Sequence, residues 1–101
     1  MNKMNNEITI FCPIFAAPGK EEALWNALVS TAAETRKEAG NICYRLHQVN
    51  GKSGEFMIYE QWRDQAALDY HMSQPYLKEL LADREHLLKD EIHGIIATES
   101  K

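Results

Sequence analysis

The stretch NICYRLHQVNGKSGEFMIYEQW, residues 41–62, decides the fold. It contains two β-prone runs, about 41–49 and 55–62, separated by the turn-forming residues 50–54. Asn and Gly between two such runs are typical of a β-hairpin. Side chains alternate between two faces of each run, and one face carries Ile42, Tyr44 and Leu46 in the first run and Phe56, Ile58, Glu60 and Trp62 in the second. The stretch therefore predicts an antiparallel hairpin with a carboxylate on an otherwise apolar face.

The residues before this hairpin predict one strand and one long helix. Residues 7–15 read as a strand whose two faces are both apolar. After the turn at Pro18-Gly19, apolar residues recur at three- and four-residue steps as far as about Ala39, which predicts a helix. Gly40 is expected to end this helix in a left-handed conformation.

The residues after the hairpin predict a short helix, a second helical stretch and a last strand. Asp64 is placed to cap a helix over 65–72. Pro75 suits the first position of the next helix, whose apolar stripe extends to Leu88. The final strand is expected over about 91–98, a run that contains Ile92, Ile95, Ile96 and Ala97.

The resulting order, β-α-β-β-α-β, predicts an α+β, ferredoxin-like fold with a four-stranded antiparallel sheet. Right-handed crossovers place the helices on one face of that sheet. The other face would expose Phe11 or Phe15, together with Met57 and Tyr59. An apolar patch of this kind is typical of an interface, so the sequence predicts a homodimer.

Length and composition exclude several classes of protein. The 101 residues fit a single domain over residues 7–101, preceded by a flexible segment over 1–6. The formal charge of −4 and the lack of a basic cluster disfavour binding to nucleic acid or to an anionic membrane. No apolar run is long enough to span a bilayer, and the polar start lacks the core of a secretion signal, so a cytoplasmic location is expected. Cys12 and Cys43 should face opposite ways and stay unpaired, and a structural zinc site is not expected.

Five short motifs occur in an order that resembles a known family. They are PGKEE at 18–22, GNICY at 40–44, YEQW at 59–62, AALDYH at 66–71 and SQPY at 73–76. Together they resemble the antibiotic biosynthesis monooxygenase family, small dimeric α+β barrels that include quinol monooxygenases. The resemblance covers nearly the whole chain, from about residue 7 to residue 98.

The resemblance implies a dimer with a central barrel and one pocket per subunit, between sheet and helices. It also implies oxidation of a quinol or hydroxyaromatic molecule by O2, with neither a metal nor a flavin as cofactor. Such chemistry is physically reasonable, because a deprotonated hydroxyaromatic is itself a good reductant. The protein then has to bind the substrate, remove a proton and stabilise the resulting charge.

His71 and Glu60 are the candidate catalytic residues. His71 shares the apolar face of its short helix with Ala67 and Leu68, so its imidazole should point inward and could accept a phenolic proton. The alternative is a core histidine bonded to Glu60 or to backbone. Glu60 could orient a histidine or act as a base with a raised pKa, or it could make a purely structural hydrogen bond.

Four further residues are candidates for contact with the substrate. Trp62 could stack on an aromatic ring or belong to the core, and the Tyr44 hydroxyl could hold a substrate oxygen. Asn41 and Tyr76 are carried over from the family positions alone, and a structural role remains open for both.

Three other functions were weighed against the monooxygenase. A haem-degrading relative would need an iron ligand at about Leu80, which cannot bind iron. An enzyme acting on a phosphorylated signalling sugar would need a basic pocket, and Arg45 lies on the opposite strand face. A dimeric barrel that binds a small hydrophobic molecule without turnover is the non-enzymatic alternative.

Overall fold

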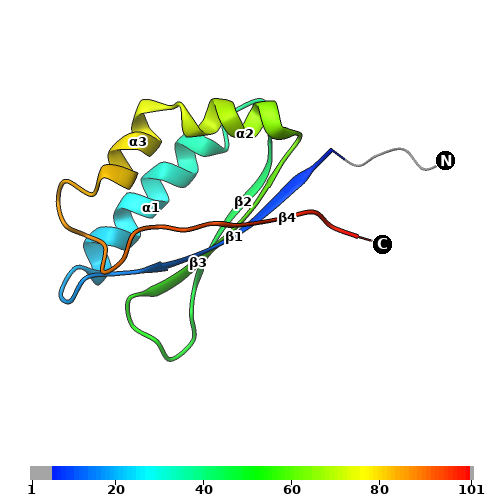
Figure 1. Ribbon diagram of the computed structural model, residues 1–101. Helices are drawn as coiled ribbons and strands as arrows, with labels where there is room; N and C mark the ends of the chain where they lie inside the picture. Colours follow the sequence, from blue (N-terminus) through cyan, green and yellow to red (C-terminus); the bar gives the residue numbers. More distant parts are fainter. Residues whose placement is uncertain (1–5, 101) are drawn as a thin grey trace.

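A computed structural model describes residues 6–100 as a sheet with helices packed against it (Figure 1). Residues 1–5 of the expected flexible segment lie outside the described residues. The elements are, in chain order, β1 (Ile8–Phe15), α1 (Glu21–Thr35), β2 (Asn41–Gln48), β3 (Glu55–Trp62), α2 (Gln65–Met72), α3 (Pro75–Ala82) and β4 (Ile95–Ala97). Within the described part, no helix is both long and apolar enough to cross a membrane.

The sheet has the strand order β2-β3-β1-β4, with every neighbouring pair antiparallel. All of the helices lie on one face of it (Figure 1). This arrangement confirms the predicted ferredoxin-like fold, and the hairpin of β2 and β3 has almost the expected bounds. One register row crosses all four strands, because Tyr44 pairs with Glu60, Glu60 with Ile10, and Ile10 with Ile96.

Alternation along the strands separates a buried face from a bare one. The inward residues of β1 and β3 pack against Leu24, Leu28 and Ala32 of α1 to form the core. On the bare face the Phe11 side chain is 41% exposed, and its ring centroid lies 5.4 Å from that of Tyr59. Cys12 faces the helices and Cys43 the bare face, and both thiols are free, as expected. The helices therefore leave the apolar bare face uncovered within the chain.

The first helix ends at Thr35, four residues earlier than predicted, and Gly40 has a different role. The Arg36 guanidinium turns away to donate to the Tyr44 carbonyl oxygen, at 3.0 Å from Nε and 2.7 Å from Nη2. Gly40 does not have a positive φ, so the predicted left-handed stop is wrong. A Cβ at Gly40 would instead lie 2.2 Å from the Cβ of Ala67, and close packing against α2 is what requires glycine here.

The C-terminal part is less regular than the leucine pattern predicted. Helix α3 ends at Ala82 because Asp83 adopts a left-handed conformation, with φ 47°. The Asp83 carboxylate then accepts hydrogen bonds from the backbone N–H groups of Leu87, at 2.6 Å, and Leu88, at 3.2 Å. Strand β4 has only three residues instead of the eight expected over 91–98. The two leucines are thus buried by a loop rather than by a longer helix.

Candidate functional site

A cavity of about 310 Å³ lies between the covered face of the sheet and the α2–α3 side of the molecule. The register row described above runs along it, with Tyr44, Glu60, Ile10 and Ile96 all in its wall. The remaining wall is mainly apolar and is formed by Cys12, Ile14, Ile58, Leu68, Met72, Leu77, Leu80, Leu81, Ile92 and Gly94, with His71, Gln65 and Asp69 as further polar members. This is the location that the sequence predicted, between sheet and helices.

His71 is placed in this wall by the way that α2 begins. The Asp64 carboxylate accepts a hydrogen bond from the backbone N–H of Ala67 at 2.8 Å and so caps the helix. One helical turn later His71 faces inward, and its side chain is 3% exposed. Its Nδ1 donates to Glu38 Oε2 at 2.8 Å. No hydrogen bond between described residues uses Nε2, so this nitrogen is the one left to face the cavity.

Glu38, in the turn between α1 and β2, is the functional candidate that sequence reasoning missed. Its side chain is only 7% exposed, and its Oε2 accepts hydrogen bonds from both His71 and the Tyr76 hydroxyl. Its Oε1 is buried without a hydrogen-bond partner among the described residues. Periodicity placed Glu38 on the last turn of a helix, where a carboxylate is ordinarily exposed. Only the early end of α1 turns this side chain toward His71.

Glu60 and Trp62 support His71 from the sheet side. The Trp62 indole N–H donates to Glu60 Oε1 at 2.8 Å, and the indole ring packs on His71 with centroids 4.4 Å apart. Burial raises the pKa of Glu60, the hydrogen bond from Trp62 lowers it and the nearby Glu38 raises it, and together they bring it to about 7. Trp62 is fully buried and does not line the cavity, so its contact is with His71. Near neutral pH the Glu60 carboxyl is therefore poised between its two protonation states.

Tyr44 and Cys12 reach the cavity as neutral groups. Burial, with a smaller contribution from Glu60, raises the pKa of the Tyr44 hydroxyl well above its ordinary value. The same two causes raise the pKa of the Cys12 thiol to about 12. The Tyr44 hydroxyl has no hydrogen-bond partner among residues 6–100, so it can donate to a bound molecule. Cys12 contributes a small apolar wall, because a thiol is a weak nucleophile until it ionises.

The other two predicted contact residues lie outside the cavity wall. The Asn41 amide donates to the carbonyl oxygens of Cys43 and Gln61, at 3.1 and 3.4 Å, where the register of β2 shifts. Tyr76 stands behind Glu38, and its hydroxyl oxygen lies 2.9 Å from Thr35 Oγ1 and 3.3 Å from His71 Nδ1. Burial, and then the hydrogen bond to Glu38, raises the pKa of Tyr76. Both residues hold parts of the site in position.

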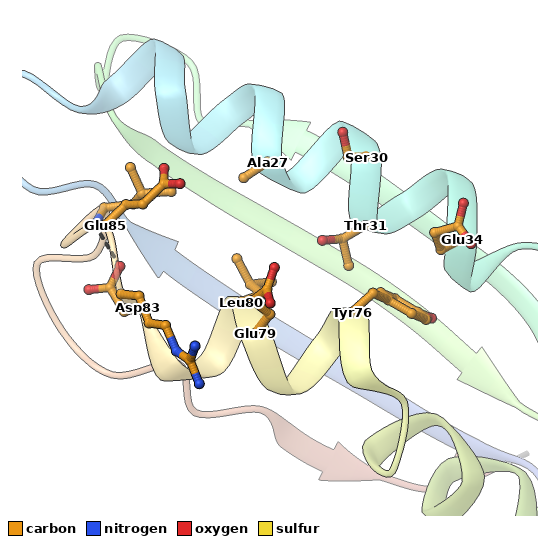
Figure 2. A pocket seen from close by; sticks show the side chains of 11 residues that line it. Ala27, Ser30, Thr31, Glu34, Tyr76, Glu79, Leu80, Asp83 and Glu85 are labelled. Atoms are coloured by element: carbon orange, nitrogen blue, oxygen red, sulfur yellow. Dashed lines mark hydrogen bonds between the residues drawn. The ribbon is translucent and has the colours of Figure 1, made fainter.

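A second hollow, of about 370 Å³, lies between α1 and α3 (Figure 2). Tyr76 and Glu34 stand at one end of it, and Asp83 and Glu85 at the other (Figure 2). Its carboxylates are mostly solvent-facing, and the Asp83 carboxylate is already used by backbone N–H groups. Of these two hollows, the inner cavity combines a buried histidine with an apolar wall, and it is the better candidate for chemistry.

The polar groups of the inner cavity favour proton transfer with an uncharged, ring-like molecule. The wall of this cavity contains a histidine, a carboxyl that titrates near neutrality and a neutral hydroxyl, and the rest of the wall is mainly apolar. Among residues 6–100, no Lys or Arg lines this cavity, so a phosphorylated sugar lacks a basic partner there for its charge. Within the described part, no three His, Cys, Asp or Glu side chains are grouped as metal ligands.

Comparison with known proteins identifies the family of the chain. The family model described as "Antibiotic biosynthesis monooxygenase" matches residues 8–83. The chain belongs to the antibiotic biosynthesis monooxygenase family. The match extends from the start of β1 to the end of α3, and so includes every polar group of the inner cavity.

Individual relatives of this monooxygenase family member cover most of its length. The protein sll1783 of Synechocystis is 34% identical over 85 residues, which are 83% of this chain but only 57% of that protein. The Bacillus subtilis protein named "Putative monooxygenase YcnE" is 30% identical over 71 residues, 70% of this chain and 75% of its own. The crystal structure of PA3566 from Pseudomonas aeruginosa has 35% identity and a TM-score of 0.83, and covers 97% of this chain and 100% of that one. The family and the name of YcnE support a monooxygenase activity.

Proposed function

We propose that the protein is a monooxygenase that oxidises a quinol or another hydroxyaromatic molecule with O2 and without a bound cofactor. The observation that carries the proposal is His71, whose Nδ1 is held by Glu38 while its Nε2 is free on the cavity side. Nε2 accepts the hydroxyl proton of the substrate, and the Glu38 carboxylate stabilises the imidazolium that forms. The resulting aromatic anion is electron-rich enough to reduce O2. The substrate supplies all four electrons that O2 takes up: one oxygen atom replaces a ring C–H with C–OH, the ring is oxidised to the quinone, and the other oxygen atom leaves as water with the two hydroxyl hydrogens of the quinol.

Tyr44 and Glu60 have distinct roles in this proposal. The Tyr44 hydroxyl stays neutral and donates a hydrogen bond to the substrate oxygen as negative charge develops there. Glu60, with a pKa of about 7, supplies a proton to the departing oxygen atom and recovers it between turnovers. The apolar walls exclude water, which strengthens both interactions.

We also propose that the protein acts as a homodimer, paired through the bare face of the sheet. Phe11 is 41% exposed there, beside the half-buried Met57 and Tyr59. Sedimentation of the wild type should give twice the chain mass, and Phe11→Glu should give a single chain. Val29→Glu, at an exposed position of α1 that is 46% exposed, is the matched control and should stay dimeric. A wild type that sediments as one chain at micromolar concentration would refute the dimer.

Oxygen uptake across a panel of hydroquinones tests the activity directly. The wild type should consume O2 without added metal or flavin, and His71→Ala should lower the rate at least tenfold, which is about 1.4 kcal/mol of barrier. His93→Ala removes a histidine whose side chain is 80% exposed and should leave the rate unchanged. Saturable quinone binding with no O2 uptake above the uncatalysed rate would favour the binding barrel instead.

A further inference from the structure

Several residues of the inner cavity wall are also exposed at the surface of the molecule. Met72 of α2, Leu81 of α3 and Ile96 of β4 line the cavity and are also 48%, 39% and 64% exposed. A residue that belongs to both the wall and the surface stands at the opening. Gln65 and Asp69, two polar residues of the same wall, are hydrogen-bonded to each other at 2.8 Å. We call Met72, Leu81 and Ile96 the apolar rim.

The size of the cavity limits what can be held inside this rim. Ligand pockets commonly have volumes of roughly 300–1,000 Å³, and about 310 Å³ is at the lower end of that range. A one- or two-ring head, with its hydroxyl at His71, fills such a space. A longer substituent on that head has to leave through the mouth. A path over the apolar rim costs less desolvation than a path over the hydrogen-bonded Gln65–Asp69 pair.

We propose that the apolar rim is a binding subsite for an aliphatic substituent, so that the substrate is a hydroxyaromatic head with an apolar chain attached. The proposal rests on the proposed function for the identity of the head. Three large side chains from three separate elements line the same cavity and expose apolar surface, and that surface is removed from water when a chain lies across it. The rim thus selects for substrates that are more lipophilic than the cavity alone requires.

Binding of two oxidised ligands tests the rim without any need for turnover. The probes are 1,4-naphthoquinone and 2-hexyl-1,4-naphthoquinone, titrated calorimetrically into the full chain. A fully buried methylene is worth about 0.8 kcal/mol, and a rim covers only one side of the chain, so about twofold per contacting methylene is expected. The hexyl compound should therefore bind at least tenfold more tightly. Equal affinities would overturn the proposal.

Rim variants distinguish a specific chain-binding subsite from a general hydrophobic affinity of the protein for the longer compound. Leu81→Gln and Ile96→Gln should each weaken hexyl-naphthoquinone binding about threefold or more beyond any effect that they have on naphthoquinone binding. Val29→Gln, at a similarly exposed position outside the cavity wall, should change neither. A loss of affinity that is the same for both quinones would overturn the rim as a chain-binding subsite.

Two parallel measurements distinguish the remaining outcomes. If the hexyl compound binds more tightly but neither hydroquinone is oxidised, the rim stands and the proposed monooxygenase function fails. If both hydroquinones are oxidised with equal KM, the function stands and the rim proposal fails.

Sedimentation of the rim variants tests another occupant of the same surface. If Leu81→Gln or Ile96→Gln separates a dimer into single chains, the rim is an interface between copies and the proposal is wrong.

Discussion

Replacing Glu38 by Gln tests the part of the site that sequence patterns did not reveal. The amide keeps the size of the side chain and an acceptor for His71 Nδ1, but it removes the negative charge beside the imidazole. A hydrogen bond to a charged group contributes about 1.5–3 kcal/mol, compared with about 0.5–1.5 kcal/mol for a neutral one. The contact at 2.8 Å is buried, so little solvent screening reduces this difference. We expect a loss of about 1–2 kcal/mol in transition-state stabilisation, or roughly 5- to 30-fold in kcat.

A second readout of Glu38→Gln does not depend on turnover. The charge of Glu38 helps to raise the pKa of Glu60 to about 7, so its removal should move that pKa toward the ordinary value of 4.5. Burial remains, and the pKa should stay above 4.5 for that reason. A titration of the Glu60 carboxyl carbon by NMR measures the shift in both proteins.

The control for this experiment is Glu34→Gln on the last turn of α1. Glu34 pairs with Lys37 at 3.2 Å and its side chain is 51% exposed, so neither the rate nor the titration of Glu60 should change. The reasoning would be refuted if Glu38→Gln left kcat and the Glu60 midpoint at their wild-type values. A lower Glu60 midpoint together with an unchanged rate would keep the electrostatic account and reject the role of Glu38 in catalysis.

Three further predictions concern stability and reactivity. Because folding raises the pKa of Glu60 from 4.5 to about 7, the unfolded state releases this proton first, and the free energy of unfolding should fall as pH rises through that window. Glu60→Gln should remove roughly 3 kcal/mol of that pH dependence in urea titrations, and identical profiles would contradict the assignment. Gly40→Ala should lower the free energy of unfolding by about 2–3 kcal/mol, because its Cβ would meet Ala67, and adding Ala67→Gly should restore part of the loss. Cys12, with a pKa of about 12, should resist iodoacetamide at pH 8 in the folded protein and react only on unfolding, which peptide mass spectrometry can follow.

Local patterns predicted most of the fold because short-range rules decide those parts. Period-two alternation in residues 55–62 fixes which side chains of β3 face the helices, and thereby places Glu60 and Trp62 on the covered face. Asp64 as a cap sets the bounds of α2 and directs His71 inward. The inward placement of these three candidate residues, Glu60, Trp62 and His71, was therefore accessible from sequence. The ends of α1 and α3 were not, because Arg36 leaves the helical pattern to donate to the Tyr44 carbonyl oxygen and Asp83 adopts a left-handed conformation, neither of which a periodic pattern of apolar residues predicts.

Sequence periodicity also could not predict which carboxylate forms the hydrogen bond with His71. Glu60 was a natural candidate to bond His71, since both face the apolar side of their elements. In the structure Glu60 accepts a hydrogen bond from the Trp62 indole N–H. His71 instead donates to Glu38, which is 33 residues away in the chain. A turn residue has no repeating pattern that predicts its direction, and packing of neighbouring elements decides it.

The order of strands and helices, the inward face of each strand and the identity of the buried histidine follow from the amino-acid sequence alone, because alternation, capping and turn chemistry act over a few residues. The pairing of Glu38 with His71, the position of Trp62 behind the imidazole and the apolar rim depend on tertiary structure. They arise where α1, α2, α3 and β4 meet, and the free energy that places them comes from burial shared between elements far apart in sequence.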